Sequence, residues 1–301
     1  MKNRIVLIAV LLISINSNAQ QLTFFSQYMI DNYNINPAAA GAYDYMPISL
    51  QVRQQWVGFE EAPSTQQIST HMNIQGHHGA GLKVYNDKLG PLSRVSVQGS
   101  YAYHIEIDRD YHLSLGMSFM MNQHRLNTSN FNLVSSTDLT LNQAGYSSTN
   151  FDADFGAYFY SDEFYVGVSA PQLFQNKYKF TDSLNSLSKQ TRHYFFSGGY
   201  RIEANSDWDV EPAFLMKATM NAPVQFDVST RVHYKDMFWG GLSWRIQESV
   251  SAMAGIIYEN FVFGYSYDFT TTDIRNYSSG THELFLGYRI PTKKLPGFAR
   301  Y

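Results

Sequence analysis

The sequence lacks cysteine and is poor in charge, and both absences narrow what the protein can be. With no Cys among its 301 residues, neither a disulfide nor a lipidated cysteine can anchor the chain. Asp, Glu, Lys and Arg make up only 16% of the residues, below the roughly 25% of typical soluble domains. The formal net charge of -3 argues against a nucleic-acid partner.

Long apolar runs are missing except near the start of the chain. Residues 5–15 are almost all apolar, Lys2 and Arg4 precede them, and small residues follow up to Ala19. This pattern predicts a secretory signal peptide over residues 1–19, cleaved after Ala19, and therefore export of the mature chain. The run is shorter than the roughly 20 residues that a spanning helix needs, so we prefer a signal peptide to a retained anchor helix.

Aromatic residues are abundant, and apolar residues alternate with polar ones. The chain holds 22 Tyr and 21 Phe. Within residues 94–107, odd positions such as Val95 and Val97 are apolar, whereas even positions such as Ser96 and Gln98 are polar. A period of two predicts β-strands, and no part of the mature chain shows a sustained helical period. We therefore predict an all-β fold.

Runs with this alternation number fourteen. An even number suits a bacterial outer-membrane barrel whose two termini lie in the periplasm. We accordingly predict an N-terminal periplasmic segment over residues 20–46, a transmembrane antiparallel β-barrel over 47–290 and a C-terminal tail over 291–301. The predicted strands are residues 47–57, 65–75, 78–87, 91–107, 110–125, 151–162, 163–170, 191–204, 208–220, 224–235, 237–247, 249–259, 260–269 and 281–290.

The connections between the predicted strands supply independent evidence. Those on the periplasmic side are short, whereas the long ones, near residues 126–150, 171–190 and 270–280, all fall on the opposite side. Short periplasmic turns and longer external loops are typical of outer-membrane barrels. The alternative is a soluble exported β-sandwich, but aromatic residues near the strand ends and the lack of a linker favour the barrel.

The sequence predicts no catalytic, cofactor-binding or metal site, and we do not expect an enzyme. His77 and His78 are adjacent but have no carboxylate close in sequence to complete a metal site. Asp152 and Asp154 share one strand face, and a hydrated lumen lining explains this pair better than acid–base catalysis. Nucleotide-binding and phosphate-binding motifs are absent.

Five short motifs are more specific than composition. They read Phe-Ser-Gln-Tyr over residues 25–28, Asn-Pro-Ala-Ala-Ala-Gly over 36–41, Arg-Gln-Gln-Trp-Val-Gly over 53–58, Asn-Asp-Lys-Leu-Gly-Pro over 86–91 and Gly-Thr-His-Glu-Leu over 280–284. Together these motifs resemble the PorP/SprF family of outer-membrane proteins, which is associated with the type IX secretion system and gliding motility.

The resemblance implies a fourteen-stranded barrel and brings no catalytic residues with it. It also implies a role beside the secretion machinery, as an accessory or surface-anchoring partner of secreted adhesins that carry a type B C-terminal sorting domain. A porin or substrate-specific channel is the alternative function. Three roles stay open for residues 20–46, namely plugging the barrel, lining its periplasmic face or pairing with another protein.

The motifs also supply candidate partner-binding positions, several of which have a purely structural explanation. Asn36 and Pro37 predict a turn, because proline disfavours a preceding helix. Gly41 and Gly58 suit backbone positions that need freedom, and Trp56 suits a membrane interface. The complete set is Asn36, Pro37, Gly41, Arg53, Gln54, Trp56, Gly58, Asp87, Gly90, His282 and Glu283.

Overall fold

The described part of the chain forms one closed β-sheet. A computed structural model describes residues 24–127, 145–177, 190–220 and 222–292. No helix among these residues is long and apolar enough to cross a membrane. The strands are β1 (Tyr45–Gln54), β2 (Ser64–Ile74), β3 (His78–Leu89), β4 (Leu92–Glu106), β5 (His112–Leu126), β6 (Tyr146–Tyr160), β7 (Phe164–Ala170), β8 (His193–Tyr200), β9 (Ile202–Glu203), β10 (Trp208–Thr219), β11 (Ala222–Tyr234), β12 (Phe238–Arg245), β13 (Ser249–Tyr258), β14 (Phe261–Thr270) and β15 (Thr281–Pro291).

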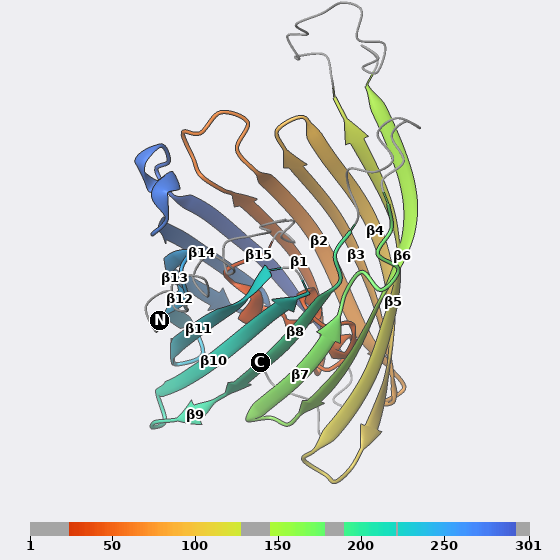
Figure 1. The fold of residues 1–301 in the computed structure, drawn as a ribbon. Helices are drawn as coiled ribbons and strands as arrows, with labels where there is room; N and C mark the ends of the chain where they lie inside the picture. Colours follow the sequence, from red (N-terminus) through yellow and green to blue (C-terminus); the bar gives the residue numbers. More distant parts are fainter. Residues whose placement is uncertain (1–23, 128–144, 178–189, 221, 293–301) are drawn as a thin grey trace, which may run out of the picture.

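The first and last strands close this sheet into a barrel. β1 pairs with β15 over its whole length, from Tyr45 opposite Pro291 to Gln54 opposite His282. Every other strand pairs antiparallel with its neighbours in the chain, and β8 and β9 both pair with β10, so they are two parts of one strand interrupted at Arg201. The described residues therefore form a fourteen-stranded barrel (Figure 1), which confirms the predicted fold and strand number.

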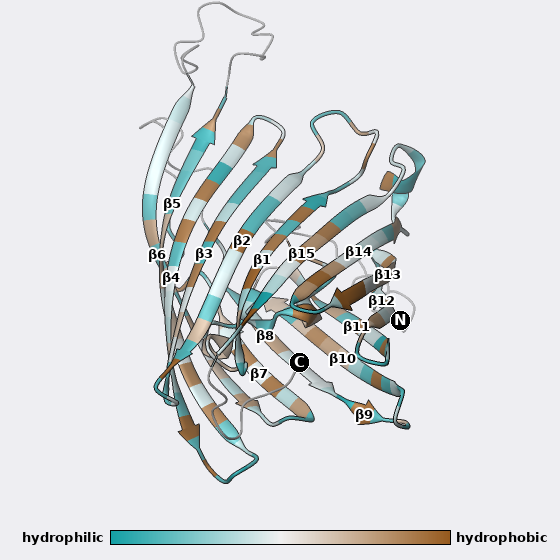
Figure 2. Cartoon of the chain, turned by 180° about the vertical axis from the view of Figure 1, so that it is seen from behind, coloured by the Kyte–Doolittle hydropathy of each residue, from teal (hydrophilic) through white to brown (hydrophobic). Residues whose placement is uncertain are grey.

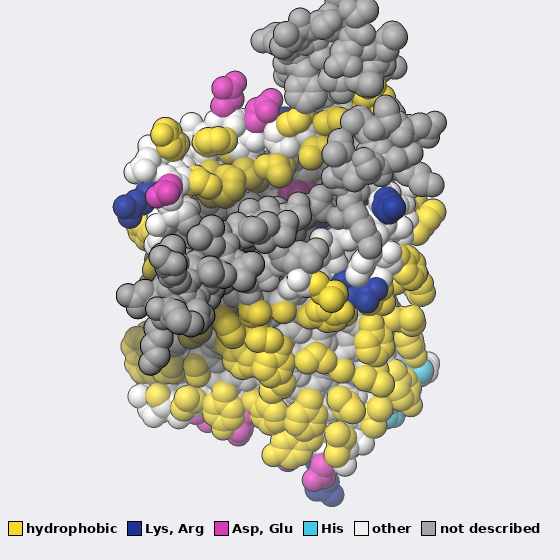
Figure 3. Space-filling model, in the orientation of Figure 1, with side chains coloured by type: hydrophobic (Ala, Val, Ile, Leu, Met, Phe, Trp, Pro, Cys, Tyr) yellow, Lys and Arg dark blue, Asp and Glu magenta, His cyan; other side chains and the backbone are white. Residues whose placement is uncertain are grey.

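Burial in this barrel is the reverse of burial in a soluble protein. On β4, the polar Ser96 and Gln98 are buried and face the lumen, whereas the apolar Val95 and Val97 are exposed on the outer wall. The same alternation runs along the other strands (Figure 2), and apolar side chains cover much of the outer wall (Figure 3). An apolar surface of this extent suits a lipid environment and contradicts the alternative of a soluble sandwich.

The two ends of the barrel differ in their connections. At one end, here called the short-turn end, β1 begins, β15 ends and every connection is brief. The opposite end, the long-loop end, carries the connections at 55–63 and 271–280 and those that follow β5 and β7, which lie partly outside the described residues. The connections of the short-turn end are residues 75–77, 107–111, 161–163, 204–207, 235–237 and 259–260.

One strand begins earlier than the sequence indicated. We expected a loop up to residue 150, but β6 starts at Tyr146, which pairs with Leu126 of β5. Ser148 faces the lumen and is buried, whereas Ser147 and Thr149 on the outer face are also polar. Because both faces are polar, this stretch lacks the alternation that identifies a strand, and the expected loop was wrong for residues 146–150.

The wall of the barrel has an uneven height. β5 and β6 each contain 15 residues, whereas β7 contains 7 and β8 contains 8. β7 pairs with β6 only over residues 155–160 of the longer strand. The long-loop rim is therefore high over β3–β6 and low over β7–β10 (Figure 1).

We predict that a charge on the outer wall destabilises the barrel. Leu242 lies in the middle of β12 with 63% of its surface exposed. Leu242→Arg should lower the free energy of unfolding in lipid vesicles by about 2–4 kcal/mol, the cost of a cation at the bilayer midplane. Leu242→Phe, which keeps the face apolar, is the matched control. Equal stability of the two variants would contradict the assignment of this face to lipid.

Candidate functional site

Residues 24–44 lie inside the barrel and are here called the plug (Figure 1). They form three short 3-10 helices, η1 (Tyr28–Ile30), η2 (Asn32–Asn34) and η3 (Pro37–Ala39). Asp31 and Asn36 cap the second and third helices, because their side chains accept hydrogen bonds from Tyr33 N and Ala38 N. Three roles were left open for residues 20–46. Residues 24–44 lie in the lumen, so the role that fits them is to plug the barrel.

Glycines on the inner wall allow the plug backbone to pack directly on the strands. A Cβ atom at Gly79 would lie 1.9 Å from the Ala40 carbonyl oxygen, and one at Gly116 would lie 2.4 Å from the Ala38 Cα. At Gly156 the Asn36 Oδ1 would be 2.0 Å away. No side chain fits at these distances, so we call these three wall glycines the seat of the plug.

The Asn36 side chain joins the plug to the wall next to this seat. Its Nδ2 donates to the carbonyl oxygens of Ala157 on β6 at 3.0 Å and Val168 on β7 at 3.3 Å, while its Oδ1 accepts from Ala38 N at 2.9 Å. A carboxylate could not donate these bonds, and alanine would leave both the cap and the wall contact unmade.

Two buried histidines bind the end of the plug. Gly41, at a φ of +80°, donates its N–H to His71 Nδ1 at 2.9 Å, so the ring proton lies on Nε2 and faces Asp31 Oδ1 at 3.2 Å. His104 Nε2 donates to the Ala40 carbonyl at 2.9 Å, and Tyr160 donates to its Nδ1 at 2.9 Å. Both rings therefore serve as hydrogen-bonding links between plug and wall.

Aromatic and apolar side chains of the plug also pack against the wall. The Tyr33 hydroxyl lies 2.9 Å from Ser100 Oγ on β4, and the Tyr28 hydroxyl lies 3.4 Å from Ser229 Oγ on β11. Burial raises the pKa of both tyrosine hydroxyls, so they stay neutral hydrogen-bonding groups. A separate apolar cluster joins Tyr28, Met29 and Ile35 to the wall residues Phe195, Leu215, Trp239 and Met253.

A buried group of charges holds the start of the plug, and we call it the latch. Arg53 of β1 pairs with Asp268 of β14 at 2.7 Å and with Glu283 of β15 at 3.0 Å. The Glu283 carboxylate also accepts the backbone N–H groups of Ser26 at 2.8 Å and Gln27 at 2.9 Å. The latch charges are almost completely buried, so loss of one partner would leave another uncompensated at a cost of roughly 3–5 kcal/mol.

Two further arginines reach the plug from the wall. Arg231 pairs with Glu211 at 2.6 Å and donates to the Met29 carbonyl at 3.0 Å. Arg245 lies 3.4 Å from Ser26 Oγ. Ion pairs and hydrogen bonds thus reach the plug from strands on several sides of the lumen, which fixes its orientation as well as its position.

Five of the candidate positions from the sequence meet in the lumen. Asn36, Pro37 and Gly41 belong to the plug, and Arg53 and Glu283 stand opposite each other in the register of β1 and β15. Sequence reasoning missed their partners on the wall, above all Asp268, His71 and the seat glycines. The sequence signal that could have identified most of these partners is a glycine or an acidic residue on the inward-facing side of an alternating strand.

The other six positions lie toward the long-loop end. Trp56 N donates to Thr281 Oγ1 at 3.2 Å, and the segment around Gly58 is bonded to the loop before β15, since Val57 N donates to the Gly280 carbonyl at 2.8 Å. These contacts are separate from the plug. The six residues are Gln54 at the end of β1, Trp56, Gly58, Asp87 near the end of β3, Gly90 in the turn to β4, and His282 at the start of β15.

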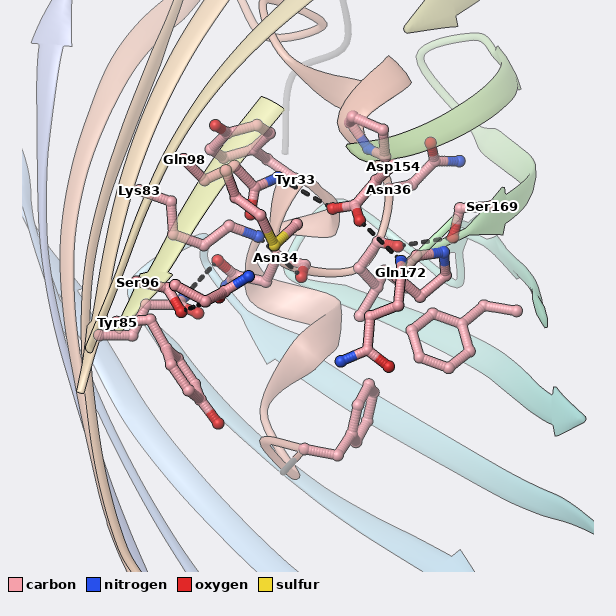
Figure 4. Close-up of a pocket in the computed structure, with 18 of the residues that line it drawn as sticks. Tyr33, Asn34, Asn36, Lys83, Tyr85, Ser96, Gln98, Asp154, Ser169 and Gln172 are labelled. Carbon is pink, nitrogen blue, oxygen red and sulfur yellow. Dashed lines mark hydrogen bonds between the residues drawn. The ribbon is translucent and has the colours of Figure 1, made fainter. Parts of the chain in front are cut away.

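A pocket of about 120 Å³ remains between the plug and the tall wall, and we call it the upper pocket (Figure 4). Tyr33, Asn34 and Pro37 line it from the plug side, and residues from β2 to β8 line it from the wall side. Within the described ranges, no group of three or more His, Asp or Glu side chains is placed to hold a metal ion. The polar wall residues that line the upper pocket are Gln67, Lys83, Arg94, Ser96, Gln98, Asn122, Asp154, Ser169 and Gln172.

Comparison with known proteins gives one family and several similar folds. The family model described as "Type IX secretion system membrane protein PorP/SprF" matches residues 17–288. None of the curated proteins matches the sequence.

Several solved protein structures share the fold at low sequence identity. The CymD monoaromatic hydrocarbon channel superimposes with a TM-score of 0.54 and 10% identity, covering 90% of this chain and 94% of that one. The toluene transporter TodX of Pseudomonas putida gives 0.50 and 9%, covering 90% and 95%. A FadL homologue of Pseudomonas aeruginosa gives 0.50 and 10%, covering 86% and 94%. At such identities the likeness concerns the fold alone.

We predict that a side chain in the seat displaces the plug. Ala39 is fully buried, and the chain has no natural cysteine, so Ala39→Cys introduces a single thiol that should resist a maleimide reagent in the folded barrel. Adding Gly116→Val should expose that thiol, because the new side chain overlaps Ala38. The measurement is the labelling rate in detergent.

The matched control for this experiment is Gly99→Val. A Cβ atom at Gly99 meets nothing within 4 Å, so the substitution adds the same side chain to the same sheet without touching the plug. Labelling that stays slow in Gly116→Val, or that rises equally in both variants, would contradict the seat.

Proposed function

Because this chain belongs to the PorP/SprF family of type IX secretion system membrane proteins, we propose that it is a sealed outer-membrane barrel that anchors or assists a secreted adhesin. In this proposal the signal peptide is cleaved near Ala19, the short-turn end faces the periplasm and the long-loop end faces outward. The adhesin carries a type B C-terminal sorting domain, and the barrel works next to the secretion machinery in adhesion or gliding.

The plug is the observation that carries this proposal. A pore needs a free lumen, whereas this lumen holds twenty-one residues of the chain itself, from Phe24 to Asp44, bound by the latch and the seat. A barrel filled in this way offers its ends and loops to a partner rather than a passage to a solute. Because the plug fills the lumen, a role as a platform for a partner protein is favoured over a role as a channel for solutes.

The long-loop end supplies the surface that suits an external partner. The connections at 55–63 and 271–280 are bonded to each other, since Val57 N donates to the Gly280 carbonyl at 2.8 Å and Ser279 N donates to the Val57 carbonyl at 2.7 Å. The candidate positions Trp56, Gly58 and His282 lie in or beside these connections. A loop shape held by backbone hydrogen bonds presents a preformed contact surface to an adhesin, without refolding on binding.

The second candidate function is a substrate-specific channel. Two observations favour it, namely the fold shared with hydrocarbon channels and the polar upper pocket between the plug and the wall. In that case the plug would be a movable gate, and its release would open a path along the lumen.

Conductance separates the two functions. We predict that the purified protein gives no steady current in planar lipid bilayers, because the plug blocks the lumen, whereas deletion of residues 24–44 produces steady pores. Gly116→Val should increase the current and Gly99→Val should not. Steady current through the unaltered protein would favour the channel over the platform.

Adhesin display tests the proposed role in the cell. Deletion of the gene should abolish surface display of a partner adhesin and leave the secretion of unrelated type IX substrates intact. Restoring the gene with Leu242→Phe, which keeps the outer wall apolar, should restore display. Normal display in the deletion strain would rule out the anchoring role.

A further inference from the structure

The part of β6 nearest the long-loop end has a neighbouring strand on one side only. β5 pairs with β6 over all 15 of its residues, from Tyr146 to Tyr160. On the other side, β7 pairs only with residues 155–160. Residues 146–154 therefore extend past the pairing with β7, and no other strand of the described part of the chain lies beside them there (Figure 1).

The contacts of β6 show which of its backbone groups face this open side. In an antiparallel strand, successive residues direct their N–H and C=O groups to opposite neighbours. Leu173 N donates to the Ala153 carbonyl at 2.9 Å, and Asn176 Nδ2 donates to the Phe151 carbonyl at 2.6 Å. Odd-numbered residues of β6 therefore face away from β5, and beyond Phe151 these residues are Thr149 and Ser147.

Ser147 and Thr149 are here called the open edge. Both are exposed, and their backbone groups form no hydrogen bond on this side with any residue that the structure describes. The described ends of the connection between β7 and β8 meet beside Phe151, because Asn176 bonds to Phe151 and its own carbonyl accepts from Gln190 N at 2.9 Å. Two N–H donors and two C=O acceptors of the open edge are therefore available to another molecule.

The open edge lies outside the lipid. On the outer face of β6, the apolar Phe151 is 66% exposed, and the next residues on that face toward the long-loop end are the polar Thr149 and Ser147. Gln123 and Arg125 lie opposite them on β5. Polar side chains on both strands mark the end of the apolar band, and unpaired backbone groups are not tolerated within hydrocarbon. The open edge is therefore reached from the water at the long-loop end.

The open edge also lacks features that protect a strand from pairing with another chain. Such features include a charged side chain, a proline and a β-bulge. Residues 146–150 read Tyr-Ser-Ser-Thr-Asn, and their register with β5 is unbroken. Nothing in this composition opposes the addition of a strand.

We propose that the open edge binds an extended segment of a partner polypeptide as an added antiparallel strand. Alternating N–H and C=O groups match the backbone of another strand, so main-chain hydrogen bonds supply the recognition. The added strand would continue the wall where β7 and β8, of 7 and 8 residues, leave it low. A second copy of the barrel inserted in the same direction would present its own edge parallel to this one, so it cannot supply the antiparallel strand.

The inference rests on the proposed platform role only for the source of this strand, a protein that approaches the long-loop end from outside. The binding mode follows from the geometry of β6 and is tested with a defined peptide. Failure of one proposal is therefore distinguishable from failure of the other, because adhesin display in the gene-deletion strain tests the platform and peptide capture tests the open edge.

The test is disulfide capture of a strand-forming peptide beside the open edge. Ser147→Cys places a single thiol there, because the chain has no natural cysteine. The purified full-length barrel is equilibrated in a thiol–disulfide buffer with the peptide Cys-Gly-Thr-Val-Thr-Val or with the same peptide methylated on its backbone nitrogens. We expect the equilibrium constant for the mixed disulfide to be at least about fivefold larger for the unmethylated peptide, the effect of one backbone hydrogen bond.

Control variants locate this preference at the open edge. Lys88→Cys, at an exposed position of β3 with strands on both sides, should capture the two peptides equally. Adding Thr149→Pro to Ser147→Cys should abolish the preference, because it removes an N–H that the pairing with β5 does not use, whereas adding Thr149→Val should retain it. Equal capture of both peptides at Ser147→Cys, the same preference at Lys88→Cys, or a preference that survives Thr149→Pro would overturn the proposal. Disulfide-linked pairs of barrels in place of peptide capture would assign the edge to a second copy and overturn it as well.

Discussion

The buried carboxylate of Glu283 is the interaction on which the rest of the structure depends. It accepts two backbone N–H groups from the plug and one ion pair from Arg53, which stands opposite it where the last strand meets the first. A charge this deeply buried is tolerated only when its partners are all present. One residue thus links the closure of the sheet to the position of the plug.

The polar lumen and the apolar exterior both follow from the position of the barrel in lipid. A barrel in lipid must place its polar side chains inward, and a lumen of this size would then hold water unless something else satisfied those groups. The plug does so with backbone carbonyls, asparagine amides and tyrosine hydroxyls. Glycines in the seat remove the side chains that would keep its backbone away from the wall, so hydrogen bonds such as those of Asn36 reach main-chain atoms of the strands.

The strands of the barrel wall could largely be predicted from the sequence, whereas the arrangement of the plug in the lumen could not. Alternation identified all fourteen strands, because each strand carries its own signal, but it missed the start of β6, where Ser147 and Thr149 make the outer face polar. The plug consists of short 3-10 turns without a period, so its place in the lumen could not be read locally. Arg53 and Glu283 stood out as motif residues, but they are 230 positions apart and no local pattern shows that they pair.

The long separation between the two ends of the latch has a consequence for biogenesis. Ser26 meets Glu283 across 257 positions of sequence, so this contact cannot form until the final strand has been delivered. Contacts between such distant positions form late, since the entropy of closing a long loop precedes any gain from the contact. A chain without its last strand would lack both the partner that closes the sheet against β1 and the carboxylate that binds Ser26 and Gln27, so one strand supplies the closure of the wall and the attachment of the plug.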